Sequence, residues 1–170
     1  MSRTDELDRG QSLVEFALVL PIIILLMMGV FDMGRVVFIN NSLSDGARHA
    51  ARHATINPRD IGVAAGDPDY CERIEEAMRS AVLGLELSGF TVTYQVITAA
   101  DAVSAQYVLC DMDGATGVSL PISASPGDRV VVALESDVEL ALPIVAAATG
   151  QSAFNLRAES TMQVTFVPST

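Results

Sequence analysis

One carboxylate stands at the front of the most apolar part of the chain. Glu15 follows Gly10 by five residues and precedes residues 16–31, which carry no charged side chain. A carboxylate at the centre of a membrane helix costs about 2.5–3.5 kcal/mol, and less near an interface. Glu15 therefore either marks a membrane boundary, with its carboxylate in water, or forms an ion pair with a cation.

A second group of side chains has the spacing of metal ligands. Asp45, His49 and His53 follow one another at four-residue intervals, which aligns them on one helix face. The zinc-binding pattern H-E-x-x-H also needs a Glu between its histidines, and that Glu is missing here. We therefore expect these three side chains to be solvated, with no metal bound.

An acidic segment has a third arrangement of side chains that could bind a metal. Asp111 and Asp113 before Gly114 match only the front of a calcium loop, because the rest of the EF-hand pattern is absent. A turn is the simpler interpretation. The sequence also lacks a nucleophile elbow, a P-loop and a Rossmann glycine pattern. We expect neither enzymatic activity nor a cofactor.

The chain has two cysteines, Cys71 and Cys110. An even number in a chain with an extracytoplasmic part favours a disulfide, and two buried free thiols are the alternative. A bridge would close a loop of about 40 residues and add about 3–4 kcal/mol in the chain-entropy model.

The apolar run predicts a membrane-spanning helix. From Leu13 it is close to the ~20 residues that cross a ~30 Å hydrocarbon core, where backbone groups must be satisfied internally. Pro21 should kink this helix rather than end it. Asp32 and Arg35, three residues apart, can pair where the helix leaves the bilayer.

The N-terminus resembles the class III signal of type IV pilin-like proteins. A short charged leader, MSRTDELDRG, ends in Gly10 and is followed directly by the apolar helix. The resemblance implies that prepilin peptidase cuts after Gly10, which makes Gln11 the new N-terminus. Since residues at i and i+4 share a helix face, Glu15 can then neutralise the α-amine of Gln11, its own or a neighbouring subunit's.

Residues 9–50 more narrowly resemble the TadE-like family of minor pilin-like proteins (pseudopilins) from the bacterial tight-adherence, or Flp, pilus system. The resemblance rests on GQSLVEFALVLP, residues 10–21, and on DGARHAARHAT, residues 45–55. It implies a subunit taking part in assembly or initiation of an adhesive pilus, with other pilin-like subunits, the pilus machinery and prepilin peptidase as partners. His49 and His53 depart from the family pattern, which leaves their role open.

The net charge and the predicted topology indicate which partners and which compartment suit the chain. The net charge is −11 and all basic residues are arginine, so the chain should repel nucleic acid. The most economical topology has a cytoplasmic leader (1–10), a single pass through the inner membrane and an acidic extracytoplasmic head, which enters the pilus or stays in the membrane.

Periodicity along the rest of the chain predicts an α+β fold. One helix, transmembrane and then spine of the head, covers residues 11–55, and the head covers 56–170. In the head, Asp67 should cap a second, short helix that extends from Pro68 to residue 87. Three or four antiparallel strands follow, with β-type patterns at residues 90–98, 106–110, 129–140 and 154–167, and a short helix is expected at 143–148.

One alternative function is consistent with the same residues. A single-pass anchor that is never processed could carry an extracytoplasmic module for binding a ligand or cation. The two hypotheses differ in the mature N-terminus, which is Gln11 in the first and Met1 in the second.

Overall fold

The computed structural model describes residues 3–56, 68–82, 85–116, 125–139, 150 and 152–165. The chain divides into two compact units. The first contains residues 1–37 and 139–153, and the second, which we call the head unit, contains residues 38–138 and 154–170. The boundary between them falls inside the first helix.

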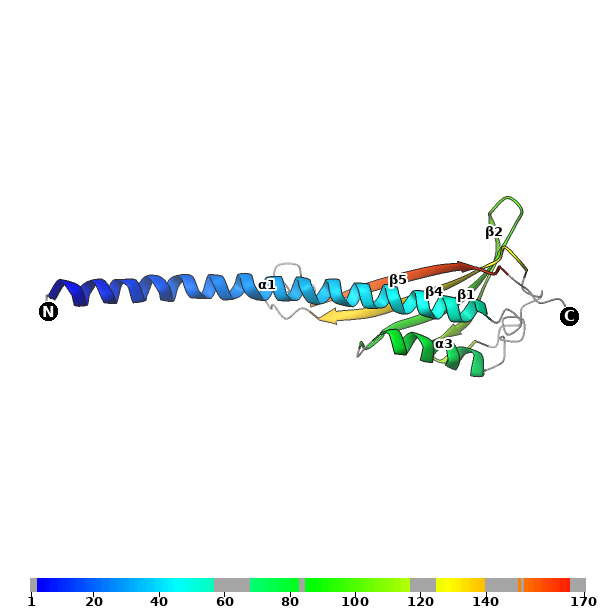
Figure 1. Ribbon diagram of the computed structural model, residues 1–170, viewed down its shortest axis with the longest axis horizontal. Coiled ribbons are helices and arrows are strands. Elements are labelled where there is room, and N and C mark those ends of the chain that lie inside the picture. Colours follow the sequence, from blue (N-terminus) through cyan, green and yellow to red (C-terminus); the bar gives the residue numbers. More distant parts are fainter. Residues whose placement is uncertain are drawn as a thin grey trace. The chain divides into compact units, whose positions relative to one another are not determined.

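Helix α1 (Arg3–Ile56) is continuous and passes through Pro21 (Figure 1). It begins eight residues before the expected start at Gln11. It ends at Ile56, just ahead of Pro58, as the restriction on the residue before proline predicts.

The C-terminal part of α1 provides one side of the core of the head unit. A stripe of mostly small residues is buried there: Leu43, Ala47, Ala50, Ala51 and Ala54. Gly46 lies in the same stripe, and a Cβ at this position would collide with Val82 and come within 3.1 Å of Leu134 Cδ1. The small side chains thus let α1 approach its neighbours closely.

Helix α3 (Pro68–Ala81) lies beside this part of α1 and runs in the opposite direction (Figure 1). The Tyr70 hydroxyl donates to the carbonyl oxygen of Ala54 at 3.3 Å, near one end of the contact. At the other end, Gly46 faces Met78 and Val82.

The prediction that α3 extends to residue 87 was wrong. Residues 85–88 are not helical, because they bond to strand β4 (Arg129–Glu139). Ser88 N–H donates to the Glu135 carbonyl at 2.8 Å, and the Ser136 hydroxyl donates to the Glu86 carbonyl at 2.8 Å. The expected cap at Asp67 and the expected helix at 143–148 lie outside the described residues.

The sheet has four long strands and one of two residues, in the order β3-β2-β1-β4-β5. Strand β1 (Gly89–Ile97) pairs antiparallel with both β2 (Val103–Asp111) and β4. Strand β3 (Gly114–Ala115) extends one edge, and β5 (Ala153–Gln163) forms the other. Bonds from Asp137 to Asn155 and from Glu135 to Arg157 show that β4 and β5 are antiparallel.

The sheet buries one face against the helices. Leu134, Val132 and Val130 of β4 lie opposite Phe90, Val92 and Tyr94 of β1, and all six are buried. The predicted α+β class, with a long N-terminal helix, a short second helix and a small antiparallel sheet, is confirmed.

Candidate assembly site on helix α1

The N-terminal half of α1 exposes a continuous apolar surface. Every residue from 11 to 28 is exposed, and large side chains on all sides stay accessible, with Phe16 at 60% and Leu26 at 67%. Soluble monomers rarely expose apolar patches larger than a few hundred Å². Among the described residues one helix, Gln11–Ile56, is long and apolar enough to cross a membrane.

Two carboxylates bracket this surface. Glu15 is exposed on α1 and lies one turn after Gln11, on the same helix face. Asp32 lies about 25 Å further along the helix axis. Because a hydrocarbon core is ~30 Å thick, a helix that crosses it must hold at least one of these carboxylates at or inside the boundary. Gly10 is helical and continuous with α1, while side chains of residues 1–10 lie outside the description.

Asp32 and Arg35 do not pair as expected. Arg35 Nη1 instead donates to the carbonyl oxygen of Glu139 at 3.5 Å. The Asp32 Oδ2 atom is buried and accepts no hydrogen bond within the described part of the chain.

The three weak metal candidates lie on the outer side of α1. Asp45, His49 and His53 are all exposed, and Asp45 Oδ1 is 3.9 Å from Arg48 Nη1. Across the segments that the structure describes, no group of three His, Cys, Asp or Glu side chains could hold a metal ion.

The head unit is cross-linked by a disulfide. Cys71 of α3 is bonded to Cys110 of β2, with their Cα atoms 5.8 Å apart, and both residues are buried. This confirms the candidate pair from the sequence. The bond joins the helical layer to the sheet across 39 residues of chain.

A buried polar network that the sequence did not reveal closes one end of the sheet. The Tyr94 hydroxyl donates to Asp128 Oδ2, and both residues are at most 2% exposed. Asp128 also accepts from Ile97 N–H and from Ser125 N–H, each at 3.0 Å. Burial, reinforced by the hydrogen bond to Asp128, raises the pKa of Tyr94. With each oxygen of Asp128 satisfied, the network is structural.

A turn at Pro126-Gly127-Asp128 supplies this carboxylate. Gly127 has a φ of 101°, which favours glycine, and Asp128 N–H donates to the Ser125 carbonyl at 3.1 Å.

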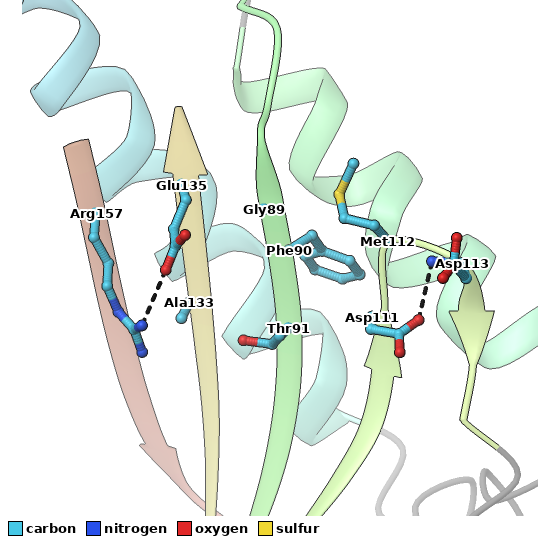
Figure 2. A pocket seen from close by; sticks show the side chains of 9 residues that line it. All are labelled: Gly89, Phe90, Thr91, Asp111, Met112, Asp113, Ala133, Glu135 and Arg157. Carbon is cyan, nitrogen blue, oxygen red and sulfur yellow. Dashed lines mark hydrogen bonds and ion pairs between the residues drawn. The ribbon is translucent and has the colours of Figure 1, made fainter. Parts of the chain in front are cut away.

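The sheet face away from the helices carries a shallow cavity of about 270 Å³. Figure 2 shows Thr91 and Ala133 in its floor, with Glu135 and Arg157 on one side and Asp111 on the other. Glu135 Oε1 is 3.0 Å from Arg157 Nη1. Asp111 Oδ1 accepts from Asp113 N–H at 2.9 Å, which makes the acidic segment the turn that the sequence predicted. Glu135 and Asp111 are thus each bound to another residue of the lining. The nine lining residues do not include a nucleophile paired with a general base.

Comparison with known proteins gives a family match, and it lies on α1. No curated protein and no solved structure matches the chain. Residues 10–52 match the family described as TadE-like protein. The match includes Gly10, Gln11 and Glu15 and ends within the packed part of α1. The resemblance to the TadE-like family that was drawn from the sequence is thereby confirmed for residues 10–52.

Proposed function

We propose that the protein is a minor pilin-like subunit (pseudopilin) that takes part in assembly or initiation of a Tad, or Flp-type, pilus. The observation that carries this proposal is the exposed apolar surface of residues 11–28 with one carboxylate, Glu15, one turn after Gln11. The TadE-like match over residues 10–52 supports it. The work of such a subunit is mechanical rather than catalytic.

Processing after Gly10 would provide a cation for Glu15. Cleavage would leave an α-amine on Gln11, four residues before Glu15 and on the same helix face. A carboxylate that must enter the edge of the bilayer would then have a cation, on its own chain or on a neighbour. Pairing between chains would also fix the axial register of adjacent helices, because each helix carries one amine and one nearby carboxylate.

The rest of the chain is assigned accordingly. Residues 1–10 form a cytoplasmic leader, residues 11–55 a transmembrane and spine helix, and residues 56–170 an extracytoplasmic head. The disulfide between Cys71 and Cys110 suits a head outside the cytoplasm, where such bonds persist. Prepilin peptidase, other pilin-like subunits and the inner membrane are the proposed partners.

The proposal is tested with Glu15→Gln in the producing bacterium. We expect the variant to be cleaved after Gly10, because the change lies outside the cut bond, but to lose copurification with the pilus machinery. Glu15→Asp keeps the charge and should restore part of the association. Asp8→Asn is the matched control, since the same acid-to-amide change falls in the leader that is removed.

The alternative, an unprocessed, membrane-anchored binding module, predicts that the mature chain still begins at Met1. Mass spectrometry of the extracted wild-type chain would then find residues 1–10 intact, and Glu15→Gln would associate normally with its partners. Either result would overturn the proposed function.

A further inference from the structure

The outer surfaces of α1 and α3 carry two rows of exposed charges. Both helices lie on the same face of the sheet, behind the strands in Figure 2, and both bury their inner sides. The α1 row consists of Asp45, Arg48 and Arg52, all of them exposed. The α3 row consists of Arg79, Glu76 and Glu72, all of them exposed.

The packing of the two helices fixes the level of each charge along their common direction. Tyr70 bonds to Ala54 at one end of the contact, and Gly46 faces Met78 and Val82 at the other, which fixes the level to within about one helical turn. Since both helices rise about 1.5 Å per residue in opposite directions, each step forward on α1 matches one step back on α3.

The three residues of one row therefore lie near residues of opposite charge in the other row. Counted from the bond between Tyr70 and Ala54, Arg52 is level with Glu72, and Arg48 is level with Glu76. Asp45 is level with Arg79, where both signs are reversed. Within one copy these charges point outward and do not meet. In the part of the chain that the structure describes, Arg52, Glu72 and Glu76 take part in no ion pair.

The remaining charges make only local contacts within their own helices. Arg48 is 3.9 Å from Asp45 on α1. Arg79 is 2.6 Å from Glu75 on α3. Neither contact joins one helix to the other, so the complementarity between the rows is unused in a single chain.

We infer that two copies of the chain associate through these helical layers, about a twofold axis parallel to α1. Such an axis keeps every residue at its own level and places the α1 row of each copy against the α3 row of the other. Arg48, Arg52 and Asp45 then meet Glu76, Glu72 and Arg79 of the second copy, and each pair occurs twice. The N-terminal end of α1 points the same way in both copies, as two anchors in one membrane require.

The contact is polar, so its strength depends on the membrane. Each exposed ion pair changes an association constant by about fivefold at most, and salt weakens it. Anchoring both copies in one bilayer raises their effective concentration and allows a contact of this kind to form. The dimer does not depend on cleavage after Gly10, so failure of the proposed function leaves this inference standing.

Cross-linking in lipid vesicles tests the register. The full-length chain is reconstituted as an equal mixture of Arg48→Cys and Glu76→Cys, and a short bis-maleimide is added; the native cysteines are bonded to each other and do not react. We expect a cross-linked pair at least about tenfold faster than for Arg52→Cys mixed with Ser80→Cys, whose levels differ by about 12 Å. Equal rates for the two mixtures would overturn the proposed register.

Charge reversal tests the sign. Arg52→Glu and Glu72→Arg should each lower the dimer fraction by about tenfold, because each change makes two repulsive contacts per dimer. The double variant Arg52→Glu/Glu72→Arg should restore it. Glu159→Arg, on strand β5, makes the same charge change as Glu72→Arg away from the helices and should have no effect. A dimer that ignores the single reversals, or a double variant that stays monomeric, would refute the contact.

Discussion

The two halves of helix α1 have surfaces of opposite kinds, although they belong to one continuous helix. Residues 11–28 carry large aliphatic and aromatic side chains and are exposed on every side. Residues 43–54 carry a narrow stripe of alanines and Gly46, and that stripe is buried. The apolar side chains of the first half point outward in every direction, whereas the second half uses small residues to bring the helix close to the sheet.

This difference shows that apolar content alone does not say what a helix contacts. A helix that is apolar all round suits lipid, since lipid tails surround it evenly. A helix with one small-residue stripe needs a partner of matching shape on one side only. The charge pattern agrees, because Glu15 and Asp32 bracket the first half and exposed arginines line the second.

Truncating a buried leucine should break the head while the same change in the first half of α1 should not. Leu134→Ala removes a side chain that is 0% exposed and should lower the free energy of unfolding of the head by about 2–5 kcal/mol. Leu25→Ala should change it by less than about 0.5 kcal/mol. Urea unfolding in detergent, followed by circular dichroism of the sheet, measures both. Similar losses for the two variants would contradict the division.

Removing the disulfide should also affect the head alone. The double variant Cys71→Ala/Cys110→Ala opens the loop between two residues that are 39 positions apart. It should lower the free energy of unfolding by about 3–4 kcal/mol in the chain-entropy model. Reductant should reproduce this loss in the wild type and have no effect on the variant. Urea midpoints with and without reductant provide the test, and an unchanged midpoint would show that the bond does not restrain the fold.

A matched pair of glycines sharpens the comparison within α1. Gly46→Ala places a Cβ against Val82 and should destabilise the head by about 1–3 kcal/mol. Gly34→Ala meets nothing within 4 Å, so it should be neutral or stabilise the helix by up to about 1 kcal/mol. Thermal unfolding of the two variants decides the matter; a tolerated Gly46→Ala would mean that the helix and sheet can separate without loss.

The smallest of these effects concerns the buried phenol. Tyr94→Phe leaves Asp128 with one donor fewer and should cost about 1–2 kcal/mol near neutral pH. Because the pKa of Tyr94 is raised in the folded state, its proton is held more tightly there than in the unfolded chain. The resulting stability is complete below the ordinary tyrosine pKa of about 10 and decreases as the pH rises above it.

Unfolding free energies at pH values of about 8 and about 10.5 test this sign. The wild type should lose stability between them by more than Tyr94→Phe does. An equal loss in both proteins would show that Tyr94 does not contribute to the alkaline dependence.

The sequence located what depends on local pattern. The apolar run from Leu13, the continuation of its helix to residue 55 and the strand at 90–98 follow from local side-chain pattern, and the structure has elements in all three places. The cysteine pair was also found, since two cysteines leave one pairing.

What the sequence could not locate depends on residues far apart in the chain. Tyr94 and Asp128 are 34 residues apart, and their bond exists only because β1 and β4 pair. The end of α3 was placed too late because its last predicted turn is drawn into bonds with Glu135 and Ser136 of β4. Competition between helix and sheet bonding is invisible to helical periodicity.

The measurement that most directly tests the two-surface account of α1 is labelling of single cysteines by a membrane-impermeant maleimide. Leu25→Cys and His53→Cys lie on the same helix and are both exposed in the protein itself. In native membranes opened to give access to both sides, we predict that His53→Cys is labelled rapidly and Leu25→Cys only after detergent is added. Labelling of Leu25→Cys at the same rate as His53→Cys before detergent would show that the first half of α1 lies in water, and would contradict the account.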